Sequence, residues 1–136
     1  MLVIDTSALI AVLLGEPGAD EIRACIAAAS ARGISAANFV ELGTVIAGQR
    51  GAGDTQAVLA CERLLAAADI AIIPITADLA RRALYARIRF GRGFGHRARL
   101  NFGDCFAYAL ATSLDAPLLF VGDDFSHTDV RRALAS

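Results

Sequence analysis

Apolar residues along this chain alternate between short β-branched runs and longer stretches with helical spacing. The run at residues 70–75 is almost unbroken, as in a strand covered on both faces of a parallel sheet. In the longer stretches, apolar residues recur at i, i+3, i+4 and i+7, the spacing of an amphipathic helix, and this spacing places Phe102 on the buried face of the last helix. Capping side chains precede several of these stretches: a hydroxyl at the first helix, Thr76 and Asn101. The pattern predicts strands at 1–4, 33–36, 70–75 and 117–121, helices at 7–14, 19–31, 38–47, 55–68, 77–90 and 102–114, and either a short helix or a late strand from residue 128.

Strands that alternate with helices predict an α/β fold with a mainly parallel sheet, helices on both faces and right-handed crossovers. We expect one domain over residues 1–136, because the chain has the length of a single domain and shows no repeat or linker. In such sheets, ligands bind beyond the carboxyl ends of the strands. Asp5 follows the first predicted strand and Asp123 follows the last, so we expect both at this edge.

The composition excludes several classes of protein. Hydrophobic residues make up 56% of the chain and charged residues 20%, which predicts a folded protein. No apolar run reaches the roughly 18 residues of a membrane span, and the N-terminus lacks the basic flank of a signal peptide, so we expect a cytoplasmic protein with no membrane partner. Three cysteines without CxxC spacing argue against a disulfide framework or a zinc site. All thirteen basic residues are arginines, which excludes mechanisms that need a lysine.

The acidic residues are the most informative part of the charge pattern, whereas the net charge of −1 indicates no partner. Four segments carry no charge except that of an acid, so arginines nearby in sequence are not available to pair with it. A carboxylate in apolar surroundings is costly unless it is paired, hydrogen-bonded or bound to a metal. These acids are Asp5 in residues 1–15, Glu41 in 33–49, Asp104 in 100–114, and Asp123 with Asp124 in 116–128.

Each aspartate also has an ordinary structural interpretation. Asp5 can bond the amides of the turn after its strand, and Asp104 can complement a helix N-terminus below an Asn101 cap. The pair Asp123-Asp124 can form a plain turn. Glu41 is different, because it lies inside a predicted helix, where no cap is needed.

Convergence of these acids on one crevice would make their charges repel one another, unless a cation neutralises them. Carboxylate oxygens suit a hard divalent cation such as Mg²⁺ or Mn²⁺. Such a cation positions and polarises a phosphate and lowers the pKa of a bound water, so the pattern favours phosphodiester hydrolysis.

Four sequence blocks resemble one known family. They are LVIDTSALIAVL at the start, SAANFVELG around the lone glutamate, LNFGDCFAYALA, and PLLFVGDDFSHTDV near the end. In this order and spacing, from Met1 to about Val130, they resemble the PIN-domain nucleases, most closely the VapC-type toxins of bacterial toxin–antitoxin pairs. The resemblance implies a three-layer α/β/α fold and Mg²⁺-dependent endoribonuclease activity, with Mn²⁺ as a possible substitute. It also implies a homodimer, and inhibition by a cognate antitoxin protein.

The resemblance also assigns roles to individual residues. The first three acids of the family motif fall on Asp5, Glu41 and Asp104, and Asp5 and Asp104 would be the principal metal ligands. For the fourth acid, the family's closing motif favours Asp124, whereas the position at the strand end favours Asp123; both stay open.

Polar neighbours of these acids are candidates for an outer shell around the metal site. A hydroxyl after the first acid, that of Thr6 or Ser7, and the amide of Asn38 are expected to orient carboxylates or a bound water.

A basic segment precedes Asp104. Seven arginines lie between residues 81 and 99, and no acid occurs from Leu79 to Gly103. The arginines at positions 81, 82 and 87 are interpreted as a solvated helix face. We expect Arg92, Arg97 and Arg99 to bind RNA phosphates, and the aromatic side chains interleaved with the arginines of this segment to stack on unpaired bases. These aromatic side chains are Tyr85, Phe90, Phe94 and His96.

Other functions remain as alternatives. His96 and His127 are candidates for acid–base catalysis, although surface histidines are common. A non-catalytic RNA-binding or partner-binding module is the main alternative to the nuclease. An aspartyl-nucleophile phosphatase is disfavoured, because no second acid lies two residues after Asp5 and the chain has no lysine.

Overall fold

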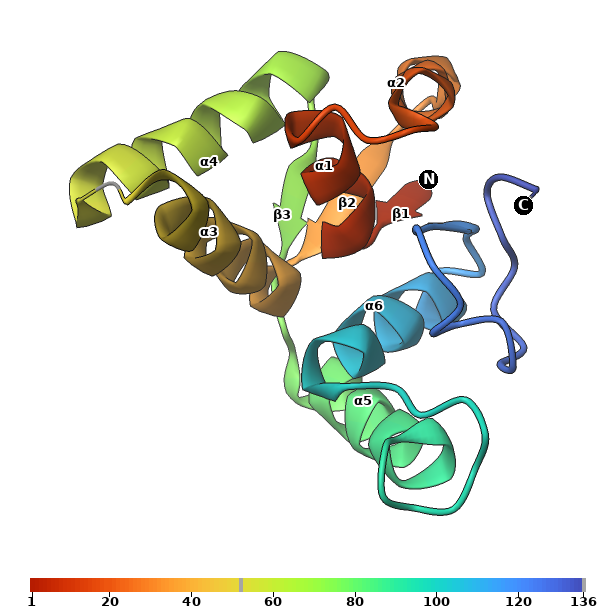
Figure 1. Ribbon diagram of the computed structural model, residues 1–136. Coiled ribbons are helices and arrows are strands. Elements are labelled where there is room, and N and C mark those ends of the chain that lie inside the picture. Colours follow the sequence, from red (N-terminus) through yellow and green to blue (C-terminus); the bar gives the residue numbers. More distant parts are fainter. Residues whose placement is uncertain (52, 136) are drawn as a thin grey trace.

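The computed structural model describes residues 1–51 and 53–135. Within these ranges, one sheet of parallel strands has the order β3-β2-β1-β4. Figure 1 shows β3, β2 and β1 side by side in this order. The predicted parallel sheet is therefore confirmed. The strands are β1 (Leu2–Ile4), β2 (Arg32–Ser35), β3 (Ala71–Ile73) and β4 (Leu118–Leu119).

Helices cover both faces of the sheet and complete three layers (Figure 1). The first four helices pack on one face and share a core with Leu2 and Ile4 of β1. The last two pack on the opposite face, against Val3. Successive side chains of β1 thus point to opposite layers. The helices are α1 (Thr6–Leu13), α2 (Ala19–Ala28), α3 (Ala36–Arg50), α4 (Asp54–Ala68), α5 (Ala77–Phe90) and α6 (Phe102–Ser113).

The order of the strands brings distant parts of the chain to one edge. The chain runs from β1 outward to β2 and β3, and then returns through α5 and α6 to place β4 on the other side of β1. The direction of winding reverses at β1, and ligands of such sheets bind at this reversal, beyond the carboxyl ends of the strands. Asp5 follows β1 immediately, so it lies at this position.

Side-chain caps start several helices as the sequence predicts. The Thr76 hydroxyl accepts a hydrogen bond from the Leu79 N–H at the start of α5. The Asn101 side chain accepts one from the Asp104 N–H at the start of α6. The cap of α1 differs from the expectation of a hydroxyl, because the Asp5 carboxylate takes this role and the helix begins one residue earlier.

Two predictions of burial are wrong. The strand predicted at 70–75 is shorter and lies at the edge of the sheet, where Ile72 is exposed. Phe102, expected on the buried face of α6, is 70% exposed because it occupies the first position of the helix, beyond the core.

The segment after Thr128 is closer to the strand alternative. Arg132 forms an isolated parallel bridge with Leu118 of β4, and the backbone on either side of Arg132 bonds to Leu118. In the part of the chain that the structure describes, no helix is both long and apolar enough to cross a bilayer.

Candidate functional site

Asp5 is a buried carboxylate with one oxygen bonded and the other free. Its Oδ2 accepts hydrogen bonds from the Ser7 N–H at 3.0 Å and from the Ser7 hydroxyl at 2.6 Å. The Ser7 hydroxyl oxygen in turn accepts the Val121 N–H at 3.0 Å, which joins the start of α1 to the segment after β4. Asp5 Oδ1 is buried and has no hydrogen-bond partner among the described residues. One oxygen therefore fixes the carboxylate and leaves the other available to a ligand.

The surroundings of Asp5 disfavour its charge. Burial raises the pKa of Asp5 to about 6, and the negative charges of Glu41 and Asp124 contribute to the increase. The two bonds from Ser7 act in the opposite direction but do not compensate for the burial. A carboxylate with this pKa gains from a nearby cation.

Asp104 lies in the first turn of α6. Its side chain accepts the Asn101 N–H at 3.0 Å, while the Asn101 side chain accepts the Asp104 N–H at 2.8 Å, which forms a reciprocal capping box. Burial raises the pKa of Asp104 to about 7, and the charges of Asp5, Asp124 and Glu41 add to this effect. Asp104 is therefore part of a helix cap, as its structural interpretation predicts, and at the same time its surroundings disfavour the charged carboxylate.

Asn38 connects the elements that carry the acids. Its side chain is fully buried, and its Nδ2 donates to the Gly103 carbonyl at 3.0 Å and to Glu41 Oε1 at 3.4 Å. Its Oδ1 accepts the Ser35 hydroxyl at 2.6 Å, and its backbone carbonyl accepts the Thr6 hydroxyl at 3.1 Å. Through its side-chain amide and its backbone carbonyl, Asn38 thereby links α3 to the residues after β1 and at the end of β2 and to the start of α6.

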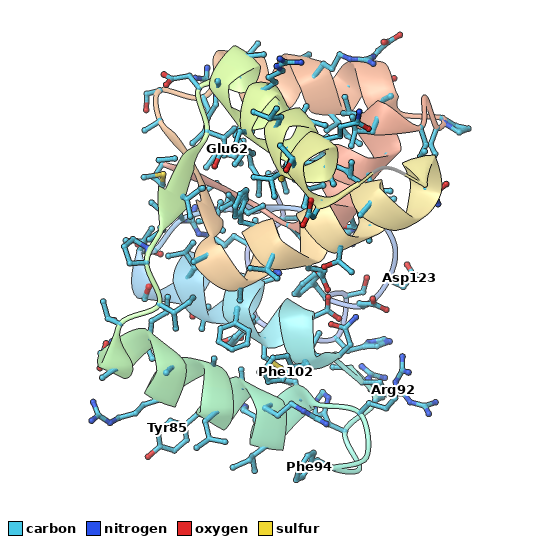
Figure 2. The ribbon with its side chains drawn as sticks, turned by 90° about the vertical axis from the view of Figure 1, so that its left-hand side faces the viewer. Glu62, Tyr85, Arg92, Phe94, Phe102 and Asp123 are labelled. Carbon is cyan, nitrogen blue, oxygen red and sulfur yellow. The ribbon has the colours of Figure 1, made fainter. Side chains whose placement is uncertain are left out.

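In the structure, four of the five predicted acids lie close enough together for their charges to interact. Glu41 and Asp124 both raise the pKa of Asp5 and of Asp104, whereas Asp123 does not contribute. Asp123 and Asp124 are exposed, and Asp123 lies at the same side of the molecule as Arg92 (Figure 2). The charge of Asp124, rather than that of Asp123, therefore acts on the buried pair.

The donor set is suited to an oxygen-seeking cation. All four interacting groups are carboxylates, and Asp5 Oδ1 is a buried oxygen with no hydrogen-bond partner in the described part of the chain. Within residues 1–51 and 53–135, however, no three acidic, histidine or cysteine side chains are yet close enough together to hold an ion. The residues match the chemistry of a Mg²⁺ site, and their carboxylates would have to approach one another around the ion.

A polar cleft of about 420 Å³ lies where the basic segment meets the segment after β4. The three arginines expected to bind RNA are exposed and line this cleft together with both exposed aspartates and His127. Positive side chains therefore lie beside the acids, as the sequence suggests. The charged and polar side chains that line the cleft are Arg92, Arg97, Arg99, Asp123, Asp124 and His127.

Other members of the basic segment have structural contacts. Arg82 pairs with Asp78 at 3.0 Å within α5, in agreement with a solvated helix face. Arg87 lies over the Phe94 ring, 5.1 Å from its centre, and donates to the Arg92 carbonyl. These side chains order the basic segment rather than project into the cleft.

Of the aromatic side chains in the basic segment, two are exposed. Tyr85 and Phe94 project from the surface (Figure 2). The prediction that Phe90 stacks on RNA is wrong, because this ring is buried between Tyr108 and His96. The ring nitrogen Nδ1 of His96 accepts the Ala98 N–H at 3.0 Å, which is a structural role.

Sequence reasoning did not identify Gly103 as part of the site. This glycine precedes Asp104 in α6, and the Glu41 carboxylate lies directly against it. The available signal was a glycine inside a helical pattern, since glycine destabilises a helix relative to alanine.

Comparisons with known proteins place this architecture in a family. The profile of the PIN domain matches residues 2–131. Ribonuclease VapC28 of Mycobacterium tuberculosis is 44% identical over 133 residues, which cover 98% of both chains. Ribonuclease VapC42 of the same species is 41% identical over 132 residues, which cover 97% of this chain and 98% of the relative.

Solved structures show the same fold at lower identity. The Mycobacterium tuberculosis toxin VapC20, described as cleaving the Sarcin-Ricin loop, matches with a TM-score of 0.71 and 20% identity, over 96% of this chain and 99% of that one. A toxin–antitoxin complex from Klebsiella pneumoniae contains a chain that matches with a TM-score of 0.68 and 20% identity, over 95% of this chain and 93% of that one. The chain therefore belongs to the PIN domain family, and within that family it is a VapC relative.

Proposed function

We propose that this chain is a Mg²⁺-dependent endoribonuclease that acts as the toxin of a toxin–antitoxin pair. The observation that carries the proposal is the group of four carboxylates at the carboxyl edge of the sheet, with one buried oxygen of Asp5 unpartnered. Relatives at 41–44% identity over nearly the whole chain are named ribonucleases, which supports the same activity here. A single nuclease domain over residues 1–136 is part of the proposal, although residues 52 and 136 lie outside the described structure.

Each acid has a proposed role. Asp5 and Asp104 are the principal metal ligands, and Glu41 and Asp124 complete the acidic site. Asp123 lines the cleft beside it. When bound, Mg²⁺ or Mn²⁺ would polarise the phosphodiester and lower the pKa of an attacking water.

The chain's own bonds orient these acids. Ser7 holds one oxygen of Asp5, so that the other is presented to the ligand. Asn101 fixes the Asp104 carboxylate through the capping box. Asn38, itself held by Ser35 and Thr6, bonds to Glu41. Preorganised ligands lose less free energy on binding a metal, so these outer contacts contribute to affinity.

RNA is the proposed substrate, and the polar cleft is its proposed binding surface. Arg92, Arg97 and Arg99 are exposed and can receive phosphates as bidentate partners beside the acids. The exposed ring of Phe94 is available for stacking on an unpaired base. Phosphate contacts position a strand without selecting its sequence, so the target RNA is not specified by this cleft.

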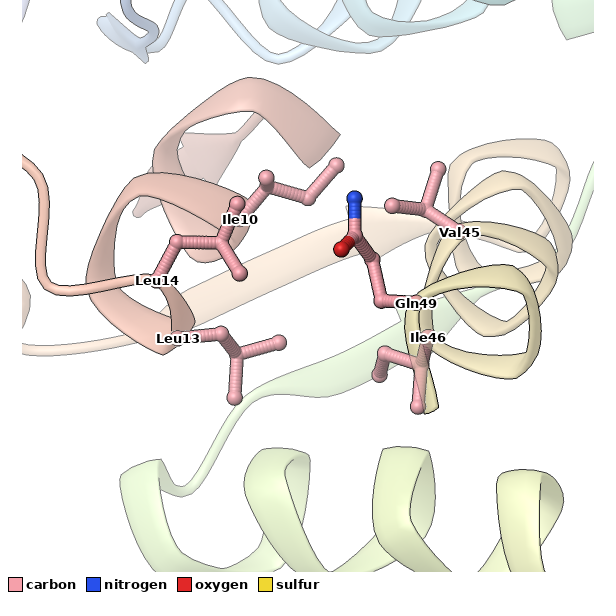
Figure 3. A pocket seen from close by; sticks show the side chains of 6 residues that line it. All are labelled: Ile10, Leu13, Leu14, Val45, Ile46 and Gln49. Carbon is pink, nitrogen blue, oxygen red and sulfur yellow. The ribbon is translucent and has the colours of Figure 1, made fainter. Parts of the chain in front are cut away.

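A cognate antitoxin is the proposed inhibitor, and apolar surfaces on both sides of α1 are its proposed docking site. One groove of about 510 Å³ runs between α1, α2 and α4 and is lined by Leu9, Val12, Ile26 and Leu64. A smaller pocket between α1 and α3 contains Ile10, Leu13 and Ile46 (Figure 3). Apolar grooves of this kind fit the hydrophobic face of a partner segment.

A homodimer is the proposed assembly. The helices α3, α6 and α5 lie next to one another (Figure 2), and each exposes large apolar side chains to solvent. Exposed apolar patches of this kind mark interaction surfaces in soluble proteins. The exposed side chains that we propose to form the interface are Val40 on α3, Phe102 on α6, and Leu84, Tyr85 and Ile88 on α5.

The nuclease is tested by incubating the purified chain, free of any partner, with a mixed pool of structured RNA in Mg²⁺, Mn²⁺ or chelator. The controls are Asp5→Ala and Glu62→Ala, the second of which removes an exposed acid of α4 that lies well apart from Asp123 and Arg92 (Figure 2). We expect cleavage that requires the metal, is lost in Asp5→Ala and persists in Glu62→Ala. Absence of cleavage by folded, metal-bound protein would favour the alternative of a non-catalytic binding module.

A further inference from the structure

A glycine occupies a position in α6 where the backbone does not require one. Gly103 is the second residue of the helix, and its φ is not in the left-handed region. Glycine inside a helix costs about 0.5–1 kcal/mol relative to alanine. Neither helix propensity nor backbone conformation therefore accounts for a glycine at this position, and its contacts in space are the remaining explanation.

The Glu41 carboxylate occupies the space that a side chain at position 103 would need. A Cβ atom at this position would lie 2.9 Å from Glu41 Cδ and 3.1 Å from Oε1, with Oε2 closer still. The three nearest atoms all belong to this one side chain. The glycine thus allows a carboxylate from α3 to lie directly against the first turn of α6.

Asn38 bonds to both residues of this contact, Glu41 and Gly103. Its Nδ2 donates to the Gly103 carbonyl and also reaches Glu41 Oε1. The amide is fully buried, and Ser35 bonds its Oδ1, so it has little freedom to turn. The carboxylate is therefore located by a bond from the amide and by contact with the glycine.

We propose that Gly103 is a positioning residue, whose missing side chain allows the Glu41 carboxylate to lie beside Asp104. The N-terminal end of a helix also favours a negative charge, which adds to the stability of this position. The inference rests on the proposed function in one respect: the benefit of placing Glu41 here is binding of a divalent cation.

The substitution Gly103→Ala separates this role from a role in folding. The atoms that a methyl group would contact lie at the end of a flexible side chain, so Glu41 can rotate away without a shift of the backbone. Alanine is also the better helix former. We expect the variant to fold with an unchanged or higher melting temperature, while its Glu41 carboxylate leaves the acidic site.

The first readout is Mn²⁺ affinity, measured by calorimetry without RNA. Loss of an orienting contact typically weakens metal binding about 10- to 100-fold, and we expect Gly103→Ala to weaken it by at least about tenfold. The matched control is Gly43→Ala in α3, where a new Cβ would meet only the Cys61 sulfur at 4.0 Å. We expect this control to bind Mn²⁺ as the wild type does.

A double substitution tests whether Gly103 acts through Glu41. If it does, Gly103→Ala combined with Glu41→Ala binds Mn²⁺ no more weakly than Glu41→Ala alone, because both changes remove the same carboxylate. Wild-type affinity in Gly103→Ala, or losses that multiply in the double variant, would overturn the proposal.

The second readout does not depend on a metal. Crystal structures of the metal-free wild type and Gly103→Ala should show the Glu41 carboxylate against α6 in the first and displaced in the second. An undisplaced carboxylate would overturn the positioning role. A wild type that neither binds Mn²⁺ nor cleaves RNA would instead contradict the proposed nuclease, and the two crystal structures would still decide the role of Gly103.

Discussion

At the scale of single residues, burial raises the pKa of the two buried aspartates, and local hydrogen bonds lower it. The Asn101 N–H stabilises the charged form of Asp104, yet burial and the neighbouring acids outweigh it and leave the pKa near 7. Asp5 shows the same balance, with Ser7 as the donor and a pKa of about 6. In the absence of a cation, both carboxylates therefore destabilise the folded protein when they ionise.

This balance predicts a pH dependence for the metal-free protein. An aspartate has a pKa of about 3.9 in the unfolded chain, whereas Asp104 has a pKa of about 7 in the fold. The free energy of unfolding is therefore highest below about pH 4, where Asp104 is protonated in both states, and it falls as the pH rises through 7. Asp104→Asn has no carboxyl at this position, so its free energy of unfolding does not fall for this reason. We expect the variant to exceed the wild type in unfolding free energy at pH 8 by on the order of 1–3 kcal/mol, with a smaller difference at pH 5.

Urea unfolding in chelator at the two pH values measures this difference. Asparagine keeps a carbonyl oxygen that can still accept the Asn101 N–H, so the cap should survive. Equal stability of the two proteins at both pH values would show that the Asp104 carboxyl is not disfavoured in the fold.

The fourth acid is decided by comparing Asp124→Asn with Asp123→Asn. Asp124 contributes to the raised pKa of both buried aspartates, and Asp123 does not. We expect Asp124→Asn to lower the RNA cleavage rate at fixed Mg²⁺ by at least about tenfold, and Asp123→Asn to change it only a few-fold. The reverse ranking would assign Asp123 to the site and would support the interpretation based on the strand end.

At this scale the sequence predicted which residue types matter, but not their contacts. The isolation of Asp5, Glu41 and Asp104 from other charges is visible in the sequence, and the fold brings these three together. The choice between the two last aspartates was not predictable, because it depends on the path of the turn after β4. The role of Gly103 depends on a contact between α3 and α6, which no local pattern encodes.

At the scale of elements, helix N-termini connect stability to the site. The Asn101 cap begins α6 and also donates its N–H to Asp104, whereas the Thr76 cap begins α5, which carries none of the acids. Sequence predicts both caps from the residue type and the apolar spacing that follows. The exposure of Ile72 was not predictable in the same way, because an apolar run does not reveal whether its strand lies at the centre or the edge of a sheet.

The two caps provide a matched pair of substitutions. Asn101→Ala and Thr76→Ala should each lower the free energy of unfolding by about 1 kcal/mol, since each leaves a helix without its side-chain cap. Asn101→Ala keeps the backbone N–H that bonds the Asp104 carboxylate, but it leaves the Asp104 N–H without its acceptor and so loosens the first turn of α6. We therefore expect only this variant to weaken Mn²⁺ binding as well, by about tenfold. Chemical denaturation and calorimetry measure the two effects separately. Equal Mn²⁺ affinity in the two variants would show that the cap has no part in the site.

At the scale of the whole molecule, the topology explains why residues distant in sequence meet. The reversal of winding at β1 places the ends of β1 and β2 and the start of α6 at one edge, and Asn38 bonds to all three regions. Alternation of strands and helices predicts the parallel sheet and its two helical layers. It does not predict which outer faces remain exposed, since exposure depends on how the helices pack around the finished sheet.

The exposed apolar face of α3, α6 and α5 leads to a prediction about assembly. If this face joins two copies, Ile88→Glu places an unpaired carboxylate in an apolar interface and should weaken the dimer by at least about tenfold. Leu14→Glu is the control, because Leu14 is equally accessible but belongs to the pocket between α1 and α3. Sedimentation at several concentrations should show a dimer for the wild type and Leu14→Glu, and a monomer at low concentration for Ile88→Glu. A dimer that resists Ile88→Glu would place the interface on another face, and a monomeric wild type would leave these apolar side chains to a different partner.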